Sequence, residues 1–196
     1  MSRREMTALD HRLYGQPWPE GDYRFFQLGF VVDDIVAAAS RWAAVHGVGP
    51  FHIGPVIEMQ AIVGGEPAPV SIQVGLAQAG PVQIELIQQH CDRPSIYRGS
   101  TAIRSPSFHQ LATVTADYDA KVEHFAKLGY EPAAESIGGS LRVAYFDTVG
   151  DFGFYTEVIE HTPSLLRRLG AISQTCAHWD GTDPVRLLTR DGYRVP

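Results

Sequence analysis

The sequence lacks the features that mark membrane, secreted or nucleic-acid-binding proteins. No apolar run approaches the roughly 20 residues of a membrane-spanning helix. The opening stretch from Met1 to Met6 has no apolar core of a secretion signal. Lys and Arg do not cluster and the net charge is −6, which argues against a nucleic acid partner. We therefore expect a cytoplasmic protein that acts on a small molecule.

Cysteine is scarce, and common catalytic motifs are missing. Cys91 and Cys176 lie far apart without a CxxC spacing, so neither a disulfide nor a thiolate metal site is predicted. No serine sits in a nucleophile elbow, and the Gly pairs do not match a phosphate-binding loop. What is present is ordinary for a globular domain, with 44% hydrophobic and 19% charged residues.

One stretch of the chain occurs twice. Residues 25–34 contain Gln27-Leu-Gly-Phe-Val31, and residues 107–117 contain Gln110-Leu-Ala-Thr-Val114. In each copy an extended apolar run ends at an aspartate, where a helical pattern begins. Internal repetition dictates architecture, so we predict one module used twice.

Each module is predicted as a strand, a helix and further strands. In the first, a strand over 24–32 leads to a helix that Asp33 or Asp34 caps, that runs to His46 and that Gly47 ends. Extended segments, with the alternation typical of strands, follow at 51–62, 70–77 and 82–88. In the second, the corresponding ranges are a strand at 107–115, a helix at 117–128 and extended segments at 130–137, 140–147 and 153–160.

The remaining segments frame these modules within a single α+β domain. We expect an N-terminal arm at 1–23, modules at 24–90 and 107–160, a connector at 91–106, and a C-terminal helix and tail at 161–196. Pro163 opens the C-terminal helix, and the stretch 179–186 is predicted as loop. The predicted fold class is therefore α+β with two tandem βαβββ modules.

The ordered set of motifs resembles the vicinal oxygen chelate superfamily, which includes glyoxalases, methylmalonyl-CoA epimerases, extradiol dioxygenases and bleomycin-type resistance proteins. Within it, the chain is most similar to the glyoxalase-like group that includes the epimerases. Four stretches carry the resemblance: Gln27-Leu-Gly-Phe-Val-Val-Asp-Asp34, Val82-Gln-Ile-Glu-Leu-Ile87, His109-Gln-Leu-Ala-Thr-Val114 and Gly153-Phe-Tyr-Thr-Glu-Val158. The resemblance implies two half-open cups around one site, and a homodimer.

The resemblance also implies a metal site, with ligands from the first and fourth strand of each half. These positions are Gln27, Glu85, Gln110 and Glu157. Their oxygen atoms suit Mg²⁺, Mn²⁺ or Ca²⁺ better than Zn²⁺, cobalt or iron. Glu85 and Glu157 stand mid-strand among apolar residues, where a bound cation or a proton would relieve the cost of a buried charge.

The chain departs from the family pattern at three positions. Similar epimerases and glyoxalases carry histidine where Gln27 and Gln110 stand, and epimerases carry a glutamate base where Gln73 stands. Glutamine transfers no protons, which argues against methylmalonyl-CoA epimerase itself. Glu85 or Glu157 is the candidate to shuttle the proton in catalysis. His109 is a further catalytic candidate, but it and Gln110 point into one cup only if their strand bulges.

Four residues are candidates for substrate binding: Tyr145, Tyr155, Arg142 and Gln73. The tyrosines could instead pack in the core, and the arginine could lie on the outer face. The predicted function is a glyoxalase-like lyase or isomerase that moves a proton next to a carbonyl through a metal-assisted enediolate. The alternative is a metal-free binding protein of the bleomycin-resistance type. A dioxygenase is disfavoured because its iron site needs two histidines.

Overall fold

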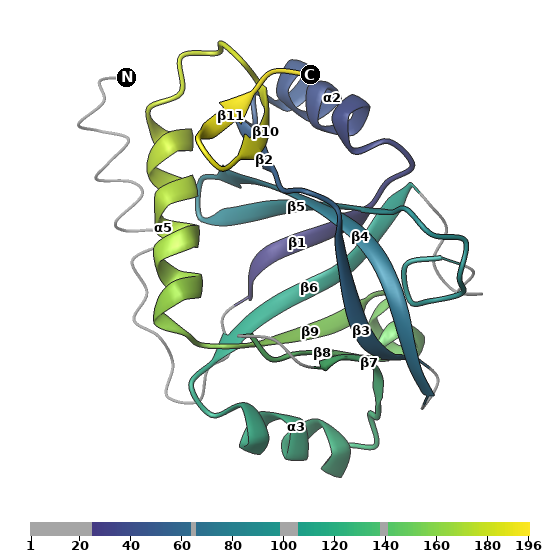
Figure 1. Cartoon of the computed structure of the whole chain (residues 1–196). Helices are drawn as coiled ribbons and strands as arrows, with labels where there is room; N and C mark the ends of the chain where they lie inside the picture. The colour runs from purple at the N-terminus through teal and green to yellow at the C-terminus, as the bar shows by residue number, and fades with distance from the viewer. Residues whose placement is uncertain (1–24, 64–65, 99–105, 138–140) are drawn as a thin grey trace.

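The computed structural model describes residues 25–63, 66–98, 106–137 and 141–196, which form four helices and eleven strands (Figure 1). The first module contains β1 (Phe25–Val31), α2 (Ile35–His46), β2 (Phe51–Ile53), β3 (Ile57–Val63), β4 (Glu66–Ala79) and β5 (Val82–Gln89). The second contains β6 (Ser107–Thr115), α3 (Tyr118–Lys127), β7 (Pro132–Ile137), β8 (Val143–Phe146), α4 (Val149–Phe152) and β9 (Tyr155–Glu160). The chain ends with α5 (Pro163–Ala177), β10 (Val185–Thr189) and β11 (Gly192–Arg194).

The α+β fold with two similar modules is confirmed, and the strands join in one curved mixed sheet. Strand β1 pairs parallel to β5, and its counterpart β6 pairs parallel to β9. The modules meet where β1 pairs with β6 and again where β3 pairs with β7, both antiparallel. Because β4 also pairs with β5, eight strands pair in a closed cycle. Their inner faces enclose the space in which the site lies.

Helix α2 begins and ends where the sequence predicts. The Asp34 carboxylate accepts hydrogen bonds from the backbone N–H groups of Val36 and Ala37 at 3.0 and 2.9 Å. Gly47 ends the helix in the left-handed conformation, with φ of 65°. The apolar side of α2 contributes Ile35 and Ala39 to a core against the outer face of the sheet.

The structure corrects the predicted elements at several places. The extended run 51–62 divides into β2 and β3 around Gly54 and Pro55, because proline cannot donate a ladder hydrogen bond. The turn before β9, predicted as loop, contains α4. The tail is not all loop, since β10 pairs parallel to β2 and extends the sheet. The predicted arm at 1–23 and the two Gly-Gly turns, at 64–65 and 138–139, lie outside the described residues.

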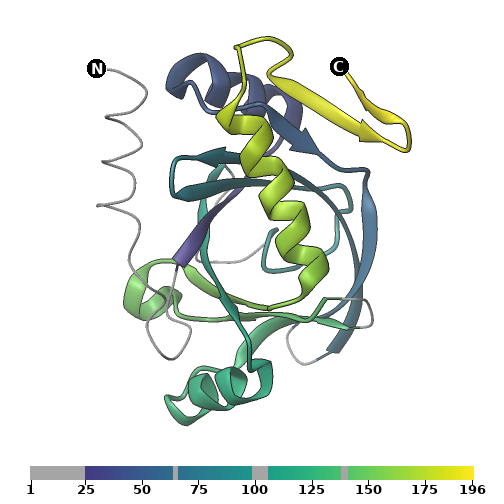
Figure 2. The same ribbon diagram turned by 90° about the vertical axis from the view of Figure 1, so that its left-hand side faces the viewer.

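Helix α5 lies across the open end of the ring of strands (Figure 2). Pro163 occupies its first turn and the Thr162 hydroxyl caps it by accepting a hydrogen bond from Leu165 N at 3.2 Å, as expected for a helix that opens on proline. Leu165 and Ile172 are buried beneath the helix. In the described part of the chain, no helix is long and apolar enough to cross a membrane.

Candidate active site

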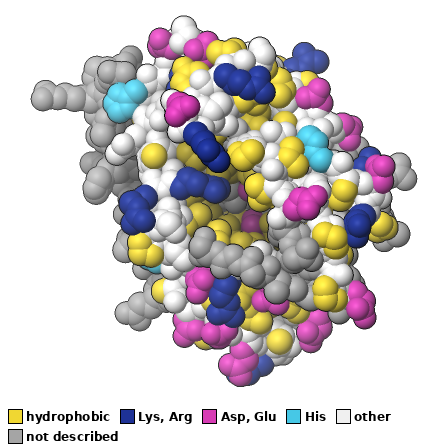
Figure 3. Space-filling view, in the orientation of Figure 1, with side chains coloured by type: hydrophobic (Ala, Val, Ile, Leu, Met, Phe, Trp, Pro, Cys, Tyr) yellow, Lys and Arg dark blue, Asp and Glu magenta, His cyan; other side chains and the backbone are white. Residues whose placement is uncertain are grey.

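A cavity of about 770 Å³ lies inside the curved sheet and beneath α5. Its walls are mostly apolar, and both modules contribute to them. Six of the polar or charged side chains that line it are Gln27, Glu85, Tyr97, Tyr145, Glu157 and Arg168. The molecular surface shows a hollow bordered by hydrophobic side chains, with an acidic side chain at its floor and basic side chains on the side of α5 (Figure 3).

The strand register brings the two glutamates to equivalent places. Glu85 on β5 pairs with Gly29 on β1, two residues after Gln27. Glu157 on β9 pairs with Ala112 on β6, two residues after Gln110. The predicted repeat therefore also holds in the pairing of the strands. Both carboxyls line the same cavity, and both are buried.

The side chain of Gln110 connects these two acids. Its Nε2 atom donates hydrogen bonds to Glu85 Oε2 at 2.8 Å and to Glu157 Oε2 at 3.2 Å. To reach Glu85, the side chain crosses β1 above Gly29, where an added Cβ would lie 2.4 Å from the Gln110 Cδ atom. Only glycine leaves room for this crossing.

A bulge in β6 turns both His109 and Gln110 inward. Gly29 pairs with Gln110 but Phe30 pairs with Phe108, so His109 is the extra residue on β6. His109 Nδ1 contacts Gln110 Oε1, and Nε2 lies 2.8 Å from the Ile96 carbonyl oxygen. His109 is fully buried and does not line the cavity, so it holds Gln110 in position.

The protonation of His109 is linked to the orientation of the Gln110 amide. Both ring nitrogens face carbonyl oxygens, which only an imidazolium satisfies, whereas burial lowers the pKa of His109. A neutral ring that donates from Nε2 to Ile96 needs a donor at Nδ1. Turning the amide supplies that donor and leaves Gln110 Oε1 to accept a hydrogen bond from the protonated Glu85 carboxyl. In either orientation, one atom of the amide lies between the two carboxyls.

Burial raises the pKa values of both acids. Burial, together with the charge of Glu157, raises the pKa of Glu85 well above its usual range, although Arg168 and Gln110 oppose the shift. Burial also raises the pKa of Glu157 to about 7, against the hydrogen bonds from Tyr145 and Gln110. Near neutral pH the coupled pair therefore holds a proton that it can donate, beside a carboxylate that can accept one.

Two tyrosines border the acids. The Tyr145 hydroxyl donates to Glu157 Oε1 at 2.8 Å, and burial raises the pKa of Tyr145 so that it stays protonated. Tyr97 packs edge-on against Tyr145 with ring centroids 5.8 Å apart. Tyr97 comes from the connector, a mostly polar stretch in which the adjacent apolar Ile96 is a weak sign of burial.

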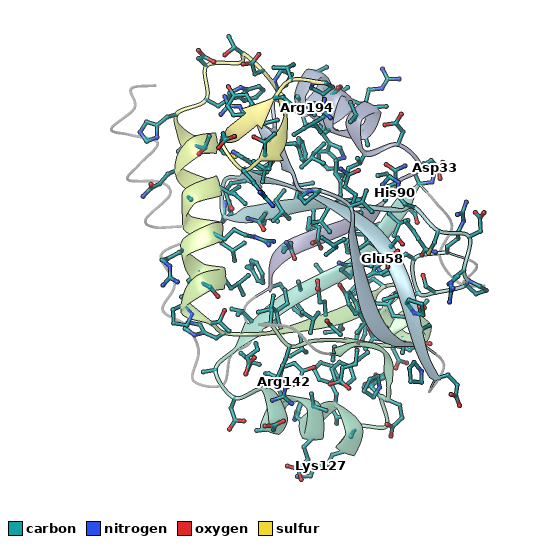
Figure 4. The ribbon with its side chains drawn as sticks, in the orientation of Figure 1. Asp33, Glu58, His90, Lys127, Arg142 and Arg194 are labelled. Carbon is teal, nitrogen blue, oxygen red and sulfur yellow. The ribbon has the colours of Figure 1, made fainter. Side chains whose placement is uncertain are left out.

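Three of the predicted substrate-binding residues do not line the cavity. Tyr155 packs on the His109 ring at 4.8 Å. Arg142 is exposed beside α3 (Figure 4), where it pairs with Asp119 at 2.6 Å. Gln73 donates to the Gly54 carbonyl oxygen at 2.8 Å. Of the predicted set, the cavity contains Gln27, Glu85, Tyr145 and Glu157.

Three of the four predicted metal ligands, Glu85, Gln110 and Glu157, contact one another, but their arrangement does not fit a divalent cation. A cation between the carboxyls would need oxygen contacts of about 2.0 to 2.6 Å, and the end of the Gln110 amide takes that place. Gln27 donates from Nε2 to Gln83 Oε1 at 2.9 Å, although its own Oε1 has no hydrogen-bond partner among the described residues. The described residues also contain no group of three His, Cys, Asp or Glu side chains that could hold a metal.

A sequence profile of the Glyoxalase/Bleomycin resistance protein/Dioxygenase superfamily matches residues 26–145. The chain belongs to this superfamily. The match ends before β9, so Glu157 and α5 lie beyond the matched part of this superfamily member. Among curated protein sequences, none matches the chain.

Solved structures with this fold include several methylmalonyl-CoA epimerases. One, in complex with methylmalonyl-CoA and NH4+, is 19% identical with a TM-score of 0.50, over 73% of this chain and 97% of that one. A Streptomyces coelicolor variant in complex with 2-nitronate-propionyl-CoA is 18% identical with a TM-score of 0.50, over 73% and 97%. The Mycobacterium tuberculosis enzyme is 21% identical with a TM-score of 0.48, over 72% and 90%. At such identities, the two structures with a TM-score of 0.50 show a shared fold.

Proposed function

We propose that this superfamily member is an isomerase, epimerase or lyase that moves a proton on the carbon next to a carbonyl group. The observation that carries the proposal is the pair of buried carboxyls, Glu85 and Glu157, that face one cavity from opposite modules. Buried acids with separated pKa values are the usual means of providing an acid and a base at one pH. All three reaction types begin with the same proton abstraction.

The residues have distinct roles in this step. The ionised Glu157 takes the proton from the carbon, since its pKa of about 7 suits a base that works near neutrality. The protonated Glu85 donates its proton to the oxygen of the developing enolate, or to the opposite face of the carbon in an epimerisation. Tyr145 supports Glu157 through its hydrogen bond, and Tyr97 lines the same part of the cavity.

The similar structures support a carbonyl substrate, since their ligands are methylmalonyl-CoA and a nitronate analogue of propionyl-CoA. We do not assign methylmalonyl-CoA itself, because Gln73 stands where the family's glutamate base is expected and it does not line the cavity. The proposed step uses no metal ion, because the Gln110 amide occupies the place between the two acids. A homodimer is a further family expectation, and light scattering after gel filtration would test it.

Proton exchange with solvent tests the proposal. The protein is incubated in D₂O with panels of 2-oxo acids and acyl thioesters, and loss of the proton next to the carbonyl is followed by NMR. We expect exchange that survives a chelator and that falls about 100-fold or more in Glu157→Gln and in Glu85→Gln. Glu131→Gln is the matched control, because Glu131 is exposed and does not line the cavity.

Two results would overturn the proposal. One is the absence of exchange on every substrate of both panels. The other is exchange that both glutamine variants retain at the rate of the unaltered protein. Dependence on added metal would contradict only the metal-free form of the step.

A second candidate is a binding protein without catalysis. It is favoured by the mostly apolar walls of the cavity and by the position of α5 across its open end. It predicts that apolar ligands raise the melting temperature without metal and without any proton exchange. Exchange on a bound ligand would exclude it.

A further inference from the structure

Helix α5 presents a mostly apolar stripe to the cavity, interrupted by one basic residue. Leu165, Arg168, Leu169 and Ile172 follow the spacing of one helix face, and all four line the cavity. Arg168 is the only Lys or Arg among the lining residues in the described parts of the chain. The neighbouring Arg167 does not line the cavity.

Within the described ranges Arg168 forms no hydrogen bond and no ion pair, whereas Arg98 and Arg142 pair with Asp92 and Asp119. The positive charge of Arg168 nevertheless acts on Glu85 and lowers its pKa, against the larger effect of burial. A guanidinium that borders a cavity and has no partner is available to a ligand.

The charges around the cavity decide how a ligand would lie. The ionised carboxylate of the acid pair at the floor would repel an anionic group, and Glu58 on β3 adds a further acid to the lining (Figure 4). Arg168 lies at the exposed side of the cavity. An anion is therefore favoured beside α5, with the rest of the ligand directed to the floor.

We propose that Arg168 binds the carboxylate of a compact carbonyl acid whose apolar chain fills the cavity. This inference rests on the proposed function, which directs the reacting carbonyl to Glu85 and Glu157. A carboxylate matches the planar fork of a guanidinium, and a doubly charged phosphate would meet more repulsion from the ionised acids of the lining. A cavity of about 770 Å³ suits a small molecule buried as a whole.

The test compares an acid with its uncharged ester. The probes are 2-oxohexanoate and its methyl ester, whose affinities are measured by calorimetry. We expect the unaltered protein to bind the acid about tenfold to a hundredfold more tightly than the ester. Arg167→Gln, the matched control on the same helix, keeps this preference. Arg168→Gln abolishes it, and Arg168→Lys, which keeps the charge but loses the planar fork, retains part of it.

The results that would overturn the carboxylate site differ from those that would overturn the catalytic proposal. If the unaltered protein binds the acid no better than the ester, or if Arg168→Gln keeps the preference, the inference is overturned. Tighter binding of hexyl phosphate than of the acid would also contradict a carboxylate site. If the preference depends on Arg168 but no proton exchanges in D₂O, the carboxylate site stands and the catalytic proposal fails.

Discussion

Glu157→Gln tests the buried acid pair through the stability of the fold. The folded-state pKa of Glu157 is about 7, above its ordinary value of 4.5. Between pH 4.5 and about pH 7, Glu157 is protonated in the folded chain but ionised in the unfolded chain. The free energy of unfolding therefore falls as the pH rises through this range. The shift corresponds to about 3 kcal/mol, since each pKa unit is worth about 1.4 kcal/mol.

Urea unfolding measured at intervals from pH 4.5 to pH 8 gives this quantity directly. The expected result is a decline that is about 3 kcal/mol smaller in Glu157→Gln than in the unaltered protein, because the amide has no proton to lose. The raised pKa of Glu85 contributes to the decline in both proteins. Glu131→Gln should retain the full decline. If Glu157→Gln shows the same decline as the unaltered protein, Glu157 does not ionise in a buried environment and the reasoning fails.

Three further substitutions test single contacts. Gly29→Ala should destabilise the fold by about 1 to 3 kcal/mol in urea, because the new Cβ collides with the Gln110 side chain. Tyr145→Phe removes a donor to Glu157, so the pKa of Glu157 should rise further, which a carbon-13 NMR titration measures. Asp34→Ala removes the cap of α2 and should cost about 1 kcal/mol of thermal or urea stability.

Each of the three substitutions has a control variant or an outcome that would contradict the prediction. Gly150→Ala is matched to Gly29→Ala, since an added Cβ there meets nothing within 4 Å, and it should change stability by less than about 0.5 kcal/mol. Equal stabilities for the two alanine variants would contradict the crossing of Gln110 over β1. A Glu157 that titrates unchanged in Tyr145→Phe would rule out the hydrogen bond, and an Asp34→Ala variant as stable as the parent would rule out the cap.

The internal repeat made the strand framework predictable from sequence. The repeated stretches around Gln27 and Gln110 indicated the first strand of each module, and the family resemblance implied that Glu85 and Glu157 face one site. The alternation of side chains on β4 explains the position of Gln73. Ile72 and Val74 line the cavity, so Gln73 between them faces away, as residues one apart on a strand must.

Other parts of the site depend on contacts that the sequence does not reveal. The bulge at His109 arises from the pairing of β6 with β1. The adjacent residues His109 and Gln110 do not indicate a bulge by their sequence alone. The role of Gly29 depends on the path of a side chain from a different strand. Tyr97 and Arg168 belong to the connector and to α5, both outside the repeat, and only the fold brings them to the cavity.

The central claim is that two acids share one buried site, one protonated and the other ready to accept a proton. Carbon-13 NMR of protein labelled at the glutamate carboxyl carbons reports both directly, with Glu85→Gln and Glu157→Gln assigning the signals. The account predicts one carboxyl that titrates near pH 7 and one that stays protonated well above the usual glutamate range. Two carboxyls that both ionise at ordinary glutamate values would contradict it.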